Sequence, residues 1–125
     1  MNKLLLNVIL MALFAVFIAS CQYKFIVEPV PPPPPPGDTT SFSLEIVPIF
    51  AEQNCTGCHP SSANLDLTAE NAYNSITSLE LVVAEDPSAS RIYYYPLPDG
   101  NHFAKYTTAQ SILIKYWIDE GAKNN

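Results

Sequence analysis

The stretch Cys55-Thr56-Gly57-Cys58-His59 decides how the rest of this sequence is interpreted. It places two cysteines three positions apart, with a histidine directly after the second. The 125-residue chain has only three cysteines and two histidines, so most of its strong metal-ligating side chains gather here. The third cysteine is Cys21 and the second histidine is His102, and both bear on what this stretch can do.

The spacing C-x-x-C-H is the attachment pattern of c-type haem. Two intervening residues put both thiols on one side of a helical turn, where each can form a thioether with one haem vinyl group. The imidazole of His59 then reaches the iron as proximal ligand, and the small residues Thr56 and Gly57 let the chain approach the porphyrin. We therefore predict one covalent haem c, attached at Cys55 and Cys58.

Other interpretations of the same residues stay open at this point. A redox-active C-x-x-C pair would not need His59, and no thioredoxin-like βαβ pattern surrounds the motif. A zinc site needs four ligands as a rule, and Cys55, Cys58, His59 and His102 could formally supply them, although adjacent Cys and His suit tetrahedral chelation poorly. An inert structural disulfide is the last alternative.

Residues 1–20 have the features of a secretion signal. Lys3 is their only charge, and residues 4–19 are almost entirely apolar. The apolar run ends in small residues, which is typical of a processed signal peptide. A membrane-spanning anchor is the alternative, but the run is slightly short for a span. An extracytoplasmic destination agrees with c-type haem, which is attached outside the cytoplasm.

Cys21 refines this prediction. Ile18-Ala19-Ser20-Cys21 resembles the bacterial lipoprotein box, in which the cysteine is lipidated and becomes the new N-terminus. The resemblance implies membrane attachment through acylated Cys21; an ordinary signal peptide with an incidental cysteine is the alternative. Gln22, rather than Asp, follows it, which favours an outer-membrane lipoprotein. No acidic run follows directly, which slightly favours the periplasmic side over the cell surface.

A proline-rich segment separates this region from the globular part. Residues 29–36 read PVPPPPPP, which favours extended polyproline II and excludes helix or sheet. Its six consecutive prolines span about 19 Å, so a stiff spacer is the plain interpretation and a ligand for a proline-recognition domain the alternative. We expect a signal peptide at 1–20, a lipid-anchored tether at 21–40 and one domain at 41–125.

The charge balance limits the partners. The chain carries 6 basic and 12 acidic residues, a net charge of −6, and removal of residues 1–20 takes away one basic residue and no acidic one, leaving −7. Such a chain is a poor ligand for nucleic acid or an anionic membrane surface. A basic protein partner remains possible.

Helical signals run through the expected domain. Pro48 fits a first helical position before Ile49 and Phe50. Thr68 is a candidate N-cap for residues 69–76, and Asp86-Pro87 forms a cap and first-turn pair before residues 88–95. The single weak strand signal is LELVV, residues 79–83.

The last helix has the strongest signals. Thr107 and Gln110 form a capping box, and Gly121 is a typical terminator. Four apolar or aromatic residues fall on one face at helical spacing: Ile112, Leu113, Tyr116 and Trp117. The fold class is mainly α, and because so short a domain builds a small core, we expect a large apolar cofactor at its centre.

These pieces resemble a small monohaem class I cytochrome c of the bacterial lipoprotein type. The resemblance rests on IVPIF before CTGCHP, then LDLTAENAY, VVAEDPSASRIYYYPLPDG and ILIKYWIDEGAKNN, in the order the family has them. It implies a class I cytochrome c-like helical domain around one covalent haem. In that family the first and last helices cross, which implies that Phe50 packs near Tyr116 and Trp117.

The sequence departs from the family at the distal iron ligand, which is usually methionine. Met1 and Met11 are the only methionines, and both lie in the expected signal peptide. Leu97, between Pro96 and Pro98, occupies the position where the family has methionine. His102 follows on the same loop, and we expect it as distal ligand; the alternatives are an open or water-bound iron, Lys105, or a tyrosinate such as Tyr106. Two imidazoles would give a lower potential than His/Met ligation.

The function that these features predict is single-electron transfer by a membrane-tethered c-type cytochrome, with an unidentified redox protein as partner. No substrate is transformed, so we do not expect an enzyme. Two alternatives remain: a small peroxidase or gas-binding haem protein with an open distal site, and a haem-containing accessory subunit of an outer-membrane complex. Arg91, the only arginine, could pair with a haem propionate or simply lie in solvent.

Overall fold

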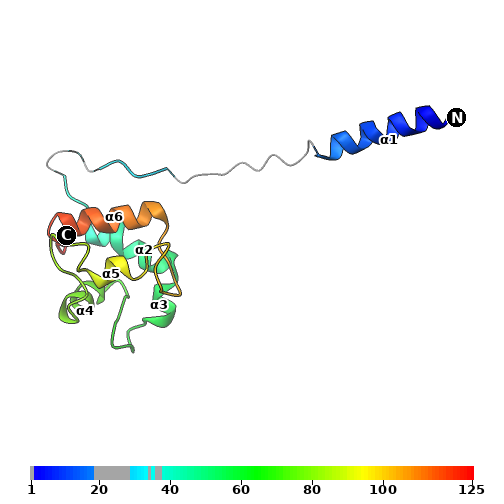
Figure 1. Cartoon of the computed structure of the whole chain (residues 1–125). Coiled ribbons are helices and arrows are strands. Elements are labelled where there is room, and N and C mark those ends of the chain that lie inside the picture. Colours follow the sequence, from blue (N-terminus) through cyan, green and yellow to red (C-terminus); the bar gives the residue numbers. More distant parts are fainter. Residues whose placement is uncertain (1, 19–28, 34, 36–37) are drawn as a thin grey trace.

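The structure is a computed structural model that describes residues 2–18, 29–33, 35 and 38–125. All regular secondary structure in these ranges is helical (Figure 1), which confirms the mainly α class. Most of the elements are short, and longer loops join the last four. In chain order they are α1 (Lys3–Ile18), the π-helix η1 (Phe42–Ile46), α2 (Val47–Glu52), α3 (Cys55–Cys58), α4 (Ala72–Ser78), α5 (Arg91–Tyr94) and α6 (Thr108–Asp119).

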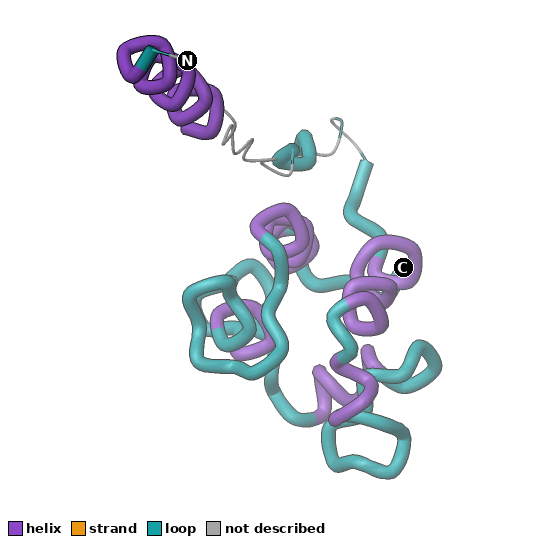
Figure 2. Tube along the Cα trace, turned by 90° about the vertical axis from the view of Figure 1, so that its right-hand side faces the viewer, coloured by secondary structure: helices purple, strands orange, loops and turns teal. Residues whose placement is uncertain are grey.

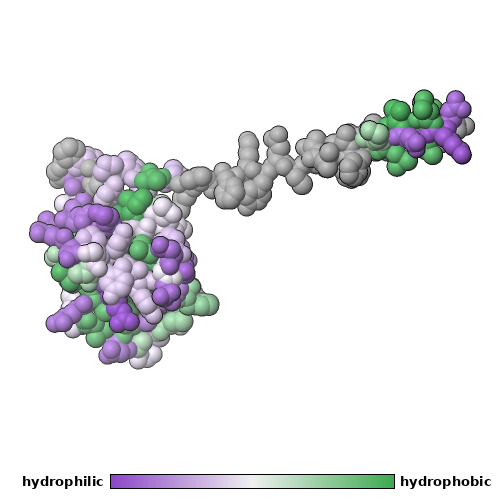
Figure 3. All heavy atoms as spheres, viewed as in Figure 1, coloured by the Kyte–Doolittle hydropathy of each residue, from purple (hydrophilic) through white to green (hydrophobic). Residues whose placement is uncertain are grey.

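Helix α1 coincides with the expected signal segment. Figure 3 shows it covered mostly by hydrophobic residues, among them Leu4 and Met11, which are 80% and 76% exposed. Within the described residues, no helix is both long enough and apolar enough to cross a bilayer. Cys21 and the lipoprotein box from Ala19 onward lie outside the described residues.

The core of the domain lies between α6 and the segment η1–α2. Phe42 packs its ring against Trp117 and Tyr73, with centroids 5.0 and 5.2 Å apart. Phe50 and Trp117 are both almost completely buried in this one cluster, in keeping with the expected crossing. The aromatic ring that packs directly against Trp117 is that of Phe42, tilted by 39°, and Tyr116 stays partly exposed.

Helix α6 is bounded as the sequence predicts. The Gln110 amide donates to Thr107 Oγ1 and the Thr107 amide donates to Gln110 Oε1, which completes the capping box. At the other end Gly121 has φ +97°, and the amides of Gly121 and Ala122 donate to the carbonyls of Ile118 and Trp117. This is the Schellman arrangement, in which glycine takes the left-handed position.

The buried face of α6 differs from the expected one. Ile112, Leu113 and Tyr116 are only partly buried, whereas five other residues of the helix are buried. Two of those are polar, and both have hydrogen-bond partners: Gln110 Nε2 donates to Glu52 in α2, and Ser111 Oγ donates to the Thr108 carbonyl, so burying them costs little. A prediction from apolar residues alone leaves out these two polar positions and therefore places the buried face of α6 at the wrong angle around the helix. The buried residues are Gln110, Ser111, Ile114, Trp117 and Ile118.

Pro48 lies in the first turn of α2, as predicted, but two other helix starts come later than predicted. Helix α4 begins at Ala72, because the Thr68 hydroxyl donates to Asp66 instead of capping a helix. Asp86 accepts from Ser88 and Ala89, so it caps a turn, and α5 begins at Arg91. No strand forms at residues 79–83.

Both ends of the domain are tied together. The Thr40 amide donates to the Glu120 carboxylate at 2.6 Å, and the amides of Phe42 and Ser43 donate to Asn125 at 2.9 Å each. Figure 2 shows the C-terminus beside the segment that enters the domain. These bonds fix η1 against α6, and so position the chain that leads into α3.

Candidate functional site

The Cys55–Cys58 segment forms a single helical turn, α3, separated from α2 by Gln53 and Asn54. Asn54 has φ 55°, the left-handed conformation that asparagine tolerates better than most residues. The His59 amide closes the turn by donating to the Cys55 carbonyl at 2.9 Å. A Cβ on Gly57 would lie 2.9 Å from Asn54 Oδ1, so this glycine makes room for the Asn54 side chain over the turn.

The two thiols of the turn differ in environment. Cys55 is buried and Cys58 is exposed, and both are free. Burial raises the pKa of the Cys55 thiol.

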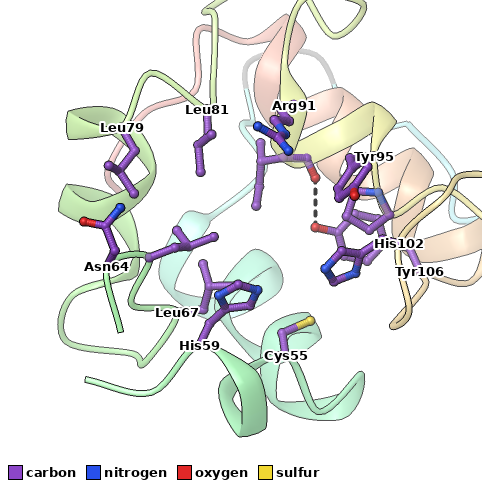
Figure 4. A pocket seen from close by; sticks show the side chains of 13 residues that line it. Cys55, His59, Asn64, Leu67, Leu79, Leu81, Arg91, Tyr95, His102 and Tyr106 are labelled. Carbon is purple, nitrogen blue, oxygen red and sulfur yellow. Dashed lines mark hydrogen bonds between the residues drawn. The ribbon is translucent and has the colours of Figure 1, made fainter. Parts of the chain in front are cut away.

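A cavity of about 400 Å³ opens beside this turn (Figure 4). Cys55, His59 and His102 border it, and most of the remaining wall is aliphatic. A second hollow of about 220 Å³ shares these three residues and adds Cys58. Cys55 and both histidines therefore border both hollows, and Cys58 borders the smaller one. The aliphatic wall consists of Leu65, Leu67, Leu79, Leu81, Ile92 and Pro96.

The two imidazoles come together across 43 positions of sequence. The ring centres of His59 and His102 lie 6.2 Å apart, and their planes differ by 20°. A transition metal bound to one nitrogen of each ring, at the usual imidazole distance of about 2.0–2.1 Å, would put the ring centres roughly 6.3 Å apart. The spacing therefore suits two imidazoles that share one metal ion.

Hydrogen bonding orients His102 for this role. Its Nδ1 lies 2.7 Å from the Ala104 carbonyl oxygen, and because a carbonyl only accepts, Nδ1 carries the proton. In the neutral ring the lone pair is then on Nε2. A backbone carbonyl that fixes the tautomer in this way is the usual partner of a metal-binding histidine.

The loop that carries His102 is held at both ends. The Tyr106 amide donates to the Pro96 carbonyl, and its buried hydroxyl donates to the Ile92 carbonyl, both at 2.9 Å. The second of these bonds is the dashed line in Figure 4. Gly100 makes the tight turn between them: a Cβ there would lie 2.4 Å from the Tyr95 carbonyl oxygen.

The other candidate distal ligands are occupied or turned away. Lys105 Nζ donates to the carbonyls of Pro98 and Gly100, at 3.2 and 2.7 Å. Burial raises the pKa of Tyr106 far above its ordinary value, which disfavours a tyrosinate. Leu97, where the resemblance to cytochromes c leads one to expect methionine, borders neither cavity.

The zinc interpretation lacks its ligand cluster. Among the described residues, no three His, Cys, Asp or Glu side chains converge as a protein-only metal site requires. A pair of imidazoles suits a metal whose remaining ligands come from a cofactor. The two cysteines, the two histidines and the aliphatic walls together fit a haem.

Sequence reasoning missed most of the cavity wall. Leu65 and Leu67 come from LDL, and Leu79 and Leu81 from LEL, the run interpreted as a possible strand. Alternating leucines in a helical domain were the available signal. Of the tyrosines, Tyr95 and Tyr106 border the cavity, whereas Tyr73 belongs to the core and donates to the Ala122 carbonyl.

Comparison with protein-family models, curated proteins and solved structures finds no match for this chain.

Proposed function

We propose that this protein is a membrane-tethered c-type cytochrome that carries single electrons through one covalently attached haem. The observation that carries the proposal is the pair of nearly parallel imidazoles, 6.2 Å apart, beside the thiols of a C-x-x-C-H turn. The apolar cavity between them supplies the volume. The packing of η1–α2 against α6, bridged by Gln110 and Glu52, supports a class I cytochrome c-like arrangement within the helical domain.

Each residue has a definite role in this proposal. The thiols of Cys55 and Cys58 add across two vinyl groups: each sulfur forms a bond to one vinyl carbon, and its proton goes to the other carbon, so no oxidant is needed. His59 and His102 would hold the iron. The bound haem would supply one-electron redox chemistry.

The protein chain controls the surroundings of that chemistry. The aliphatic wall excludes water and lowers the local dielectric, which disfavours a gain of net charge at the metal. With His59 and His102 both holding the iron, neither a peroxide nor a gas would find an open site. This favours electron transfer over the peroxidase or gas-binding alternative, and the partner we expect is another redox protein. Lipidation of Cys21 and a periplasmic, outer-membrane location remain part of the proposal.

Intact mass of the protein secreted by a host that attaches c-type haem tests the proposal. We expect the mass of one haem on the unmodified chain and none on the Cys55→Ser/Cys58→Ser variant. Cys21→Ser is the matched control, because it should keep the haem and lose only the lipid. A native protein without added haem would overturn the proposal.

Carbon monoxide binding separates the two haem functions. With His102 bound, the reduced protein should bind carbon monoxide slowly, at a rate limited by loss of the imidazole. Rapid binding at a rate proportional to gas concentration would favour the open-site alternative.

A further inference from the structure

Arg91 is the only permanently charged side chain on the wall of either cavity. It begins α5 and lies at the mouth of the larger cavity, across from Cys55 (Figure 4). The chain has a net charge of −6 and no other arginine. A lone cation at the mouth of an otherwise apolar cavity indicates a ligand that is apolar in its body and anionic at one edge.

The guanidinium is held in place but not neutralised. It lies 5.0 Å from the centre of the Tyr95 ring, a cation–π distance. Among the described residues the only ion pair joins Lys115 and Asp119, so no carboxylate of the described chain compensates Arg91. Its hydrogen-bonding fork is therefore free to bind a carboxylate from outside the protein.

We infer that Arg91 binds a carboxylate of the haem and, with Cys55 at the opposite side of the cavity, fixes the direction in which the haem lies. This inference rests on the proposed function and adds a residue to it. A haem carries its vinyl groups and its carboxylates on different edges. The structure places the Cys55 thiol and the Arg91 guanidinium on different sides of one cavity, in the same order (Figure 4).

Arg91 is also linked to the metal site through Tyr95. The Tyr95 ring lies 5.3 Å from the His102 ring and is tilted by 59°. The same aromatic side chain therefore supports both the guanidinium and the distal imidazole. Loss of the Arg91 charge should act on the iron through the uncompensated carboxylate, because a nearby negative charge stabilises the oxidised metal.

The test is the midpoint potential of the holoprotein measured across pH 5 to 8. Arg91→Gln removes the charge and should lower the potential. It should also make the potential fall as pH rises, because a carboxylate without its cation has a higher pKa and titrates within this range. Lys123→Gln is the matched control: it removes one positive charge from an exposed position that borders neither cavity.

A potential and pH profile of Arg91→Gln equal to those of Lys123→Gln would overturn the inference and reduce Arg91 to a surface residue stacked on Tyr95. If Arg91→Gln does not accumulate with haem, Arg91→Lys replaces it. Lysine keeps the charge but loses the paired N–H donors of the guanidinium. The lower potential and its fall with rising pH should therefore both appear, but in smaller form. A potential and pH profile identical to those of the unmodified protein would overturn the inference. Absence of haem from the unmodified chain would overturn the proposed function as well.

Discussion

The two histidines reach the cavity from parts of the chain that are built in different ways. His59 ends a single turn whose five residues are contiguous; its amide donates to the Cys55 carbonyl, and its carbonyl accepts from the Leu67 amide. His102 lies on a loop that is held by bonds from Lys105 and Tyr106 to distant carbonyls. A local motif needs little support, whereas a loop ligand depends on every bond that holds the loop. The distal side should therefore be the more fragile half of the site.

The largest effect should come from removal of the loop ligand itself. His102→Ala should change a low-spin haem to high-spin, because no other described side chain is free to replace the imidazole, and it should speed carbon monoxide binding. Absorption spectra of both redox states report this directly. Asn101→Ala is the neighbouring control, since Asn101 is exposed and borders neither cavity, and its haem should stay low-spin. An unchanged low-spin spectrum in His102→Ala would show that His102 is not the ligand.

The same substitution, glycine to alanine, can be made in both parts of the site: at Gly100 in the distal loop and at Gly57 in the C-x-x-C-H turn. Gly100→Ala puts a Cβ 2.4 Å from a backbone carbonyl in the distal loop, so the loop must shift, at a cost of about 1–3 kcal/mol. Gly57→Ala meets only the Asn54 side chain, which can move, and alanine favours a helix by up to about 1 kcal/mol.

We expect denaturant unfolding of the holoproteins to show a clear loss for Gly100→Ala and a change within about 1 kcal/mol for Gly57→Ala. Only Gly100→Ala should also raise the high-spin fraction. Equal losses in the two variants would contradict the contrast between a self-contained turn and a dependent loop.

A smaller effect is expected from acid. Hydrogen bonds from the Thr68 hydroxyl and amide, and from Asn71, lower the pKa of Asp66. The contribution of Asp66 to stability is therefore complete above its unfolded pKa, near 3.8, and is lost as pH falls through the lower folded value. This residue supports the loop that brings Leu65 and Leu67 to the cavity.

Thermal unfolding of Asp66→Asn should thus show a deficit near neutral pH that shrinks as the medium approaches pH 3. Asp99→Asn is the control, because no side-chain hydrogen bond within the described residues depends on Asp99, and it should behave as the unmodified chain at both pH values. A deficit independent of pH would show that the ionised carboxylate is not what stabilises the loop.

The smallest effect should come from restoring the family's usual residue. Leu97→Met places a thioether where the resemblance expects the distal ligand, but Leu97 borders neither cavity. The spectrum of the variant should therefore remain that of two imidazoles. A new methionine–iron absorption feature would mean that the distal loop presents Leu97, not His102, to the metal.

The sequence predicted the site better where its parts are local. The C-x-x-C-H turn, the capping box at Thr107 and the terminator Gly121 each depend on residues within a few positions, and the structure reproduces them. The pairing of His59 with His102 was reached by eliminating other ligands and not by pattern. No local rule could place the Ala104 carbonyl that orients His102.

Errors arose where polar groups satisfy each other in ways that apolar periodicity ignores. Thr68 is a good N-cap by type, yet Asp66 takes its hydroxyl, and α4 starts later. Gln110 and Ser111 can be buried on α6 because Glu52 and the Thr108 carbonyl accept hydrogen bonds from them. Such pairings are tertiary or depend on a particular turn, so they cannot be found by counting apolar residues along one helix.

Electron paramagnetic resonance of the oxidised protein is the most direct test of the central claim, that His59 and His102 bind one iron between them. Their planes differ by 20°, and nearly parallel imidazoles split the iron d orbitals unequally. The account predicts a single low-spin signal of rhombic shape. A high-spin axial signal from covalently bound haem would contradict it, because one of the two imidazoles would then be absent from the metal.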